Sequence, residues 1–178
     1  MSFIIDSIAA VHVISSMFAM AIGLPILAAK KGDKLCELKM GLTENLEPCG
    51  FFDDNVWWRG IADLVILNEE DKVAWAIDYK TSKNTRYADK GQLELMAMAL
   101  FKHFPNIETV RGGLVFVVCD ELVKEEYEHT VASSLWTKWL TDYSRMEKAQ
   151  EKNVWNANQS GLCKRHCVVT ECVYNGRN

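Results

Sequence analysis

The hydrophobic positions of this chain recur with two periods, one typical of helices and the other of strands. Apolar residues three and four positions apart indicate a helix face, whereas short apolar runs between polar segments indicate strands. The pattern predicts, in chain order, a helix over 6–22, strands over 35–42, 57–67 and 72–80, a helix over 89–104, a strand over 109–119 and a long helix over 121–152. This order predicts an α/β fold with a mixed sheet flanked by helices.

Length and composition fit one globular domain over residues 1–178. The chain is 49% hydrophobic and 25% charged, which is ordinary for such a domain, and its net charge of -4 gives no overall sign of nucleic-acid binding. Within this domain we expect four parts: an N-terminal helical segment (1–30), a core with the candidate site (34–119), the long helix (121–152) and an irregular, cysteine-rich tail (153–178).

The N-terminal segment is almost entirely apolar from residue 8 to residue 29, which is long enough to span a bilayer. A signal peptide is disfavoured, because the charge that precedes this run is Asp6 and not a basic region. Polar residues within the run and the break at Gly23-Leu24-Pro25 favour a buried amphipathic helix with His12 facing inward. No membrane contact is therefore favoured, and a membrane-tethered protein is the alternative.

Two neighbouring predicted strands each carry an acidic residue within or at the end of an apolar run. Asp78-Tyr79-Lys80 closes one apolar run, and Asp63 lies fifteen residues before Asp78 in another. If the intervening turn centres near Glu70-Asp71, Asp63 faces Asp78 with Cβ atoms roughly 5 Å apart. Like charges repel at that distance, so two carboxylates with Lys80 on the same face indicate a site for a hard divalent metal and an activated water. The alternative is a solvated strand end.

A basic segment follows this acidic pair. Four basic residues fall within eleven positions and are opposed there by Asp89 alone: Lys80, Lys83, Arg86 and Lys90. Such a segment predicts contacts with a phosphate backbone, and its alternative is a solvated loop that leads into a helix. Trp57 and Trp58 open a neighbouring strand, where aromatic rings stack on unpaired bases if they are exposed and join the core if they are not.

These motifs, in this order, resemble the PD-(D/E)XK nuclease superfamily, and in detail its RecB-like branch of phage and CRISPR-adaptation exonucleases. Arg59-Gly60-Ile61-Ala62-Asp63 is similar to that branch's G-x-x-D motif, and Asp78-Tyr79-Lys80-Thr81 to its D/E-x-K motif. Gln92 matches the glutamine of its Q-x-x-x-Y motif, although Met96 stands in place of the tyrosine. The resemblance implies a restriction-endonuclease-like core with the element order αβββαβ.

The resemblance also implies roles for individual residues. Asp63, Asp78, the Tyr79 carbonyl and His12 would be ligands of Mg²⁺ or Mn²⁺, and the histidine favours Mn²⁺. Lys80 would orient or deprotonate the attacking water and offset charge on the phosphate. Gln92 would bind the phosphate or the water. The four catalytic residues would thus be Asp63, Asp78, Lys80 and Gln92, with Lys83, Arg86 and Lys90 as DNA-binding residues.

The function implied is that of a metal-dependent deoxyribonuclease, with an exonuclease favoured. It would act on single-stranded DNA or DNA ends in phage-like recombination or end processing, alongside a recombination partner protein. The expected location is the cytoplasm of a bacterial or phage-infected cell. The alternative within the same fold is a protein that binds DNA without cutting it, since Met96 cannot hydrogen-bond a phosphate.

The tail carries three clustered cysteines, Cys163, Cys167 and Cys172. In a chain without a signal peptide, such clustering argues for a metal more than for disulfides. The resemblance implies an iron–sulfur cluster, but a fourth ligand is needed and the chain has no cysteine before Cys36. We therefore rank an empty or partial site first, an iron–sulfur cluster second and zinc third, with three free thiols in a loose tail as the further alternative.

Overall fold

The computed structural model of the chain describes residue 27 and residues 29–86, 88–156 and 159–176. Their contacts form two compact units, residues 1–137 and 138–178, which are described separately below. The helix expected over 6–22, with His12, lies outside the described residues, as does most of the apolar run. Within the described residues, no helix combines the length and the apolar character that a bilayer span requires.

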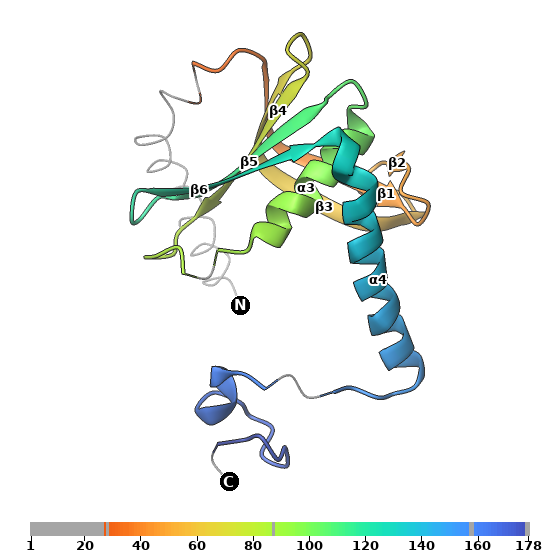
Figure 1. The fold of residues 1–178 in the computed structure, drawn as a ribbon, viewed down its shortest axis with the longest axis vertical. Coiled ribbons are helices and arrows are strands. Elements are labelled where there is room, and N and C mark those ends of the chain that lie inside the picture. Colours follow the sequence, from red (N-terminus) through yellow and green to blue (C-terminus); the bar gives the residue numbers. More distant parts are fainter. Residues whose placement is uncertain (1–26, 28, 87, 157–158, 177–178) are drawn as a thin grey trace, which may run out of the picture. The chain divides into compact units, whose positions relative to one another are not determined.

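The first unit is built around a six-stranded sheet (Figure 1). Its strands are β1 (Asp33–Thr43), β2 (Pro48–Cys49), β3 (Val56–Asn68), β4 (Val73–Lys80), β5 (Thr109–Phe116) and β6 (Glu121–Glu128). They lie in the order β2-β1-β3-β4-β5-β6, in which β4 and β5 are parallel and every other neighbouring pair is antiparallel. The predicted α/β fold with a mixed sheet is confirmed.

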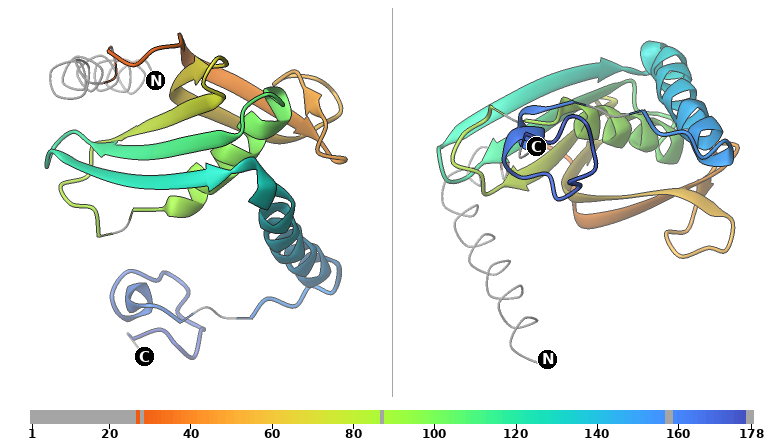
Figure 2. Two further views of the ribbon diagram at one scale, coloured as in Figure 1. Left: turned by 45° about the horizontal axis from the view of Figure 1, so that its top comes forward. Right: turned by 90° about the horizontal axis from the view of Figure 1, so that it is seen from below.

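Helix α3 (Lys90–His103) connects the two parallel strands and lies across one face of the sheet (Figure 2). Parallel neighbours need such a crossover, because a tight turn cannot bring the chain back to the starting edge. The Asp89 side chain caps the helix by accepting a hydrogen bond from Gly91 N at 2.9 Å. Leu93 is fully buried against Leu114 and Phe116 of β5. This packing holds the start of α3 over the end of β4.

The turn between β3 and β4 fixes the register of the two strands. Asp71 N donates to Asn68 Oδ1 at 3.0 Å, and Asn68 Nδ2 donates to Asp71 Oδ2 at 2.7 Å. The turn is therefore centred between Glu70 and Asp71, as predicted, and Asn68 pairs with Val73. Because a slip of one residue would move every side chain to the other face, this turn determines which residues meet farther along the ladder.

The long helix predicted over 121–152 is wrong in its first part, because residues 121–128 form strand β6, antiparallel to β5. This segment contains several glutamates and one lysine, and half-buried and exposed positions alternate along it, as on a strand with one packed face. Val123 and Tyr127 pack on the cluster of Leu93 and Phe116. The residues that complete the segment are the 3-10 turn η1 (His129–Val131) and helix α4 (Ala132–Glu151).

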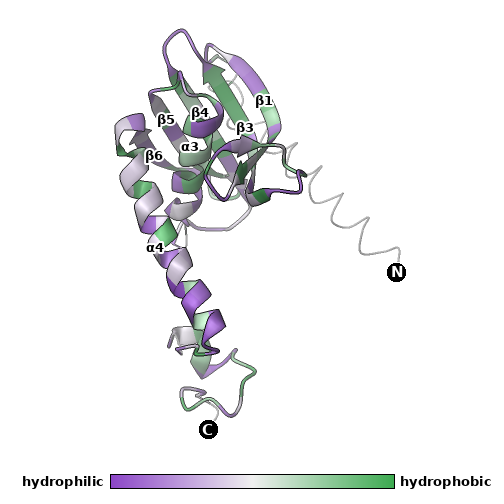
Figure 3. Ribbon diagram, turned by 90° about the vertical axis from the view of Figure 1, so that its right-hand side faces the viewer, coloured by the Kyte–Doolittle hydropathy of each residue, from purple (hydrophilic) through white to green (hydrophobic). Residues whose placement is uncertain are grey.

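Helix α4 begins in the first unit, where Trp136 is buried, and hydrophilic residues predominate toward its end (Figure 3). The described tail contains one short 3-10 turn, η2 (Gly161–Lys164), and is otherwise irregular, as predicted. Asn175 is buried there and its Nδ2 donates to the carbonyl oxygens of Cys167 and Val169, at 3.3 and 2.8 Å. Hydrogen bonds, more than apolar packing, hold this segment together.

Candidate active site

Asp63 and Asp78 lie where the ladder between β3 and β4 ends. The last pair of that ladder is Leu64 with Ile77, and the next positions in the same register are Asp63 and Asp78. Beyond that pair, the Asp63 side chain and not a backbone carbonyl of β3 accepts the next hydrogen bond from β4. Tyr79 N donates to Asp63 Oδ2 at 2.8 Å. The register therefore brings together the two carboxylates that the sequence predicted to face each other.

Asp78, Lys80 and Gln92 form a closed ring of polar contacts. Gln92 Nε2 donates to Asp78 Oδ1 at 2.6 Å, and Lys80 Nζ donates to Gln92 Oε1 at 2.7 Å. Lys80 Nζ also lies 2.7 Å from Asp78 Oδ2 as an ion pair. Two of the three residues come from the end of β4 and the third from the first turn of α3, so the crossover helix completes the site.

The second carboxylate oxygen of Asp78, Oδ2, is buried and needs a partner. The Asp78 side chain is 9% exposed, and its Oδ2 accepts no hydrogen bond from any described residue. The Lys80 ammonium, 2.7 Å away, balances the charge of this oxygen, and lone pairs of the oxygen remain available to a further ligand. A buried carboxylate oxygen without a donor is costly, and a bound cation would remove that cost.

The electrostatics of Asp63 favour a cation as well. Burial raises the pKa of Asp63 above its ordinary value, and the charges of Asp78 and Glu37 raise it further. The hydrogen bond from Tyr79 N and the Lys80 ammonium act in the opposite direction on this pKa. The ionised form of Asp63 is thus held in an environment that a positive ion would stabilise.

The donor set fits a hard divalent cation. Asp63 and Asp78 supply carboxylate oxygens, which Mg²⁺ and Mn²⁺ prefer, and such ions commonly take their other ligands from water and substrate phosphates. Among the described residues, no group of three or more His, Cys, Asp or Glu side chains gathers to hold an ion. The candidate ligands among the described residues are therefore the carboxylates of Asp63 and Asp78, and His12 lies outside the described part of the chain.

Gly60, three residues before Asp63, has a steric role. A Cβ atom built on Gly60 would lie 2.3 Å from Cη2 of Trp58, so a larger residue here would require the Trp58 ring to move. Trp57 and Trp58 are both half-buried. Because both rings are partly packed against the protein, they offer less free surface for stacking on bases than fully exposed rings would.

The predicted DNA-binding residues flank the site but differ in their surroundings. Lys83 and Arg86 are exposed in the segment that joins β4 to α3. Lys90 is also exposed, but its Nζ forms an ion pair with Glu125 Oε1 at 2.5 Å. A phosphate would have to compete with Glu125 for Lys90, so we expect this ion pair to reduce the contribution of Lys90 to DNA binding.

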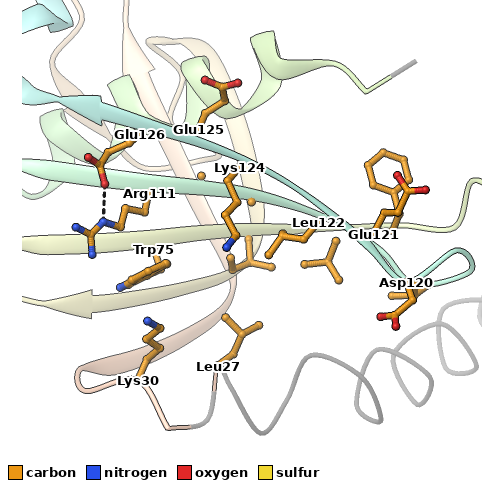
Figure 4. Close-up of a pocket in the computed structure, with 16 residues that line it drawn as sticks. Leu27, Lys30, Trp75, Arg111, Asp120, Glu121, Leu122, Lys124, Glu125 and Glu126 are labelled. Atoms are coloured by element: carbon orange, nitrogen blue, oxygen red, sulfur yellow. Dashed lines mark hydrogen bonds and ion pairs between the residues drawn. The ribbon is translucent and has the colours of Figure 1, made fainter. Parts of the chain in front are cut away.

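A hollow of about 730 Å³ lies on the sheet surface formed by β4, β5 and β6 and is separate from the acidic pair (Figure 4). Ile77 and Trp75 line it, whereas Asp63, Asp78, Lys80 and Gln92 do not. The alternation of side chains along β4 explains this, since Ile77 and Asp78 point to opposite faces. The hollow is also largely apolar, and the chemistry of the site lies on the other side of β4.

Two parts of the site region were not predicted. One is the Tyr79 N–H, which holds Asp63 in place and which no side-chain motif could reveal. The other is a pair of aromatic residues, Phe51 and Phe52, in the loop between β2 and β3. Gly50 and Asp53 flank these two residues, and glycine and aspartate are typical of turns. The sequence could therefore have indicated a turn that carries the two rings.

Comparison with known families identifies the chain. The family model for the PD-(D/E)XK nuclease superfamily matches residues 25–172, and the chain belongs to this superfamily. A search of curated proteins found no match. Among solved structures, a chain described as "Crystal structure of SSO0001" is similar at 12% identity with a TM-score of 0.40, over 86% of this chain and 66% of that one. The present chain thus spans just under two thirds of that protein's length.

Proposed function

We propose that this protein is a divalent-metal-dependent DNA nuclease whose site is formed by Asp63, Asp78, Lys80 and Gln92. The observation that carries the proposal is the buried Asp78 Oδ2, which has a cationic neighbour but no hydrogen-bond donor and lies next to a second carboxylate in the register. Membership of a nuclease superfamily supports the same reaction class. The bond that breaks is a phosphodiester bond, and the attacking group is water.

Each residue has a defined part in this reaction. Asp63 and Asp78 would hold the cation, which when bound supplies Lewis-acid polarisation of the phosphate and a lower pKa for the attacking water. The Lys80 side chain is 31% exposed, so its ammonium can reach a phosphate or water at the mouth of the site. There it would orient the water and stabilise the negative charge that develops on the phosphate. Gln92 keeps Asp78 and Lys80 in register through its two hydrogen bonds.

The finer assignment follows from the resemblance to the RecB-like branch. We propose Mg²⁺ or Mn²⁺ as the cation, with His12 and the Tyr79 carbonyl as further ligands. The favoured substrates are single-stranded DNA or DNA ends, cut by an exonuclease that acts in phage-like recombination or end processing with a partner protein. The proposed location is the cytoplasm of a bacterial or phage-infected cell.

A second candidate is a nuclease-fold protein that binds DNA without cutting it. Met96 stands where the family motif has a tyrosine, and its side chain is 4% exposed in α3, where it packs in the core. A buried thioether gives a phosphate nothing to bind, so one contact of the family's site is missing. The complete ring of Asp78, Lys80 and Gln92 favours the active enzyme over this alternative.

The test is cleavage of end-labelled single-stranded and duplex DNA with Mn²⁺, with Mg²⁺ and with EDTA. We expect cleavage with either ion, none with EDTA, and loss of both cleavage and Mn²⁺ binding in Asp78→Ala. Asp33→Asn is the matched control, since Asp33 is an exposed aspartate of β1 outside the site. Stable DNA binding without cleavage in the presence of either ion would contradict the nuclease proposal and support a protein that binds DNA without cutting it.

A further inference from the structure

A row of exposed residues leads from the acidic pair along β3 and β1. Arg59 and Ile61 precede Asp63 at alternate positions of β3, and alternate positions share a face of a strand. Lys39 of β1 pairs with Ile61, and Gly41 pairs with Arg59. Lys39, Arg59 and Ile61 are all exposed, and Ile61 is 39% exposed although it is large and apolar. The row therefore continues the surface on which Asp63 lies.

Two aromatic rings stand at the far end of this row. Phe51 and Phe52 make an edge-to-face pair with ring centroids 4.9 Å apart. Lys39 Nζ lies 5.9 Å from the ring centroid of Phe51 and 5.4 Å from that of Phe52. Arg59 Cζ lies 5.7 Å from the Phe51 ring. Two cations and two rings thus gather at one place, although they come from three separate segments.

The turn that carries the rings is held by its own hydrogen bonds. Asp53 Oδ2 accepts from Gly50 N at 2.7 Å, and Asp53 N donates to Gly50 O at 3.2 Å. Phe52 is nevertheless 75% exposed. A ring that is held in position but left in water contributes little to folding, and an exposed aromatic beside cations is typical of a binding surface.

We propose that Lys39, Phe51, Phe52 and Arg59 form a binding surface for single-stranded DNA, which we term the aromatic–basic strip. Aromatic rings stack on unpaired bases whatever the sequence, and basic side chains between them bind the phosphates. The four residue-to-residue steps from Arg59 to Asp63 cover roughly 13 Å of β-strand, so a DNA strand bound at the strip can continue into the acidic pair. The inference deepens the proposed function, on which it rests, by assigning the unpaired part of the substrate to β1–β3.

The strip favours single strands over duplex for a geometric reason. Bases within a duplex are stacked on one another and do not offer a free face to Phe52, whereas their phosphates remain available to Lys39 and Arg59. Substitutions of the aromatic residues and of the basic residues should therefore affect DNA binding differently. Loss of a ring should affect single strands alone, and loss of a charge should weaken binding to both forms.

The experiment measures binding of a fluorescein-labelled oligothymidine and of a blunt duplex by anisotropy, in EDTA and with Asp78→Asn in every chain to stop cleavage. We expect Phe52→Ala to weaken single-strand binding about tenfold and to leave duplex binding unchanged. Phe52→Tyr should restore it. Arg59→Ala should weaken both and reduce the slope of log affinity against log salt by about one. Leu122→Ala is the matched control, since Leu122 is a large apolar residue of β6 that is 50% exposed.

The proposed role of the strip is contradicted if Phe52→Ala and Arg59→Ala bind the oligothymidine as tightly as the Leu122→Ala control. Equal losses for single strand and duplex in Phe52→Ala would also overturn it, because stacking would then not be the cause. Lys39→Glu provides a second test that leaves the turn intact and should weaken binding to both forms. Cleavage by the wild-type chain with Mn²⁺ is measured separately, so that failure of the nuclease proposal and failure of the strip are distinguished.

Discussion

Gln92 Nε2 donates a hydrogen bond to Asp78 Oδ1 at 2.6 Å, although fourteen positions of sequence separate the two residues. This contact joins the first turn of α3 to the carboxylate near the C-terminal end of β4. Since Gln92 Oε1 accepts a hydrogen bond from Lys80 Nζ, one side chain contacts both Asp78 and Lys80 of the D-x-K motif. The crossover helix therefore positions the site as well as closing the sheet.

Replacing Gln92 should destabilise the protein. Gln92→Ala leaves Asp78 Oδ1 without its donor inside a buried site, and such a loss costs about 1–3 kcal/mol in the free energy of unfolding. Urea unfolding at neutral pH measures it. Gln150→Ala is a suitable control, because Gln150 is exposed in α4 and should change the unfolding free energy by less than about 0.5 kcal/mol. A Gln92→Ala protein as stable as the control would show that the ring of contacts does not support Asp78.

Removing the Lys80 ammonium should separate metal binding from catalysis. Lys80→Ala should abolish cleavage, because Lys80 is the cationic member of the ring and neither Asp78 nor Gln92 can offset the charge that develops on the phosphate. It should bind Mn²⁺ at least as tightly as wild type, because Lys80 Nζ competes for Asp78 Oδ2, 2.7 Å away. Calorimetric titration with Mn²⁺ and a cleavage assay on the same preparation test both halves. Cleavage at the wild-type rate would remove Lys80 from the site.

Tyr127 should make the protein sensitive to alkaline pH. Burial, followed by the charges of Glu125 and Glu94, raises the pKa of Tyr127 from 10.0 to about 12. The unfolded chain thus loses this proton at lower pH than the folded chain, so stability falls as pH rises from about 10 to about 12. Tyr127→Phe has no proton to lose, and its melting temperature should fall less over the same range. Equal alkaline losses in both proteins would contradict the packing of β6 described here.

The sequence was sufficient for the parts of the fold that depend on local pattern. The apolar runs of β3 and β4 and the polar turn between them predicted the register that brings Asp63 to Asp78, and Asn68 and Asp71 hold that turn. Strand β6 was missed because its inward residues are separated by glutamates and a lysine, a composition that favours a helix. Its strand form depends on pairing with β5, which no local pattern contains.

The site was harder to predict than the sheet. The types and spacing of Asp63, Asp78 and Lys80 indicated a metal site, but the hydrogen bond from Tyr79 N depends on strands that separate at the end of their ladder. The aromatic–basic strip was missed for a related reason. Lys39 and Arg59 are twenty positions apart, and only the pairing of β1 with β3 brings them to the same surface.

The cysteine-containing tail gives the last prediction. Asn175 is 4% exposed and donates to two carbonyl oxygens, while Gly176 N donates to Cys163 O at 3.0 Å. These contacts hold together the segment that contains the three cysteines. The sequence offers three clustered thiolates and no obvious fourth ligand, so we expect protein purified without oxygen to carry little iron or zinc.

Asn175→Ala should open this segment, because the buried amide donates to the carbonyl oxygens of Cys167 and Val169. Amide exchange should quicken over residues 160–176 and the thiols of Cys163, Cys167 and Cys172 should react faster with a maleimide, while unfolding of residues 27–137 stays unchanged. Val173→Ala is the control, since Val173 is 84% exposed and should alter neither measurement. A brown protein that absorbs near 400 nm and loses its colour in Cys167→Ser would contradict the empty site and establish an iron–sulfur cluster. In that case the cluster, and not Asn175, would supply most of the stability of the tail.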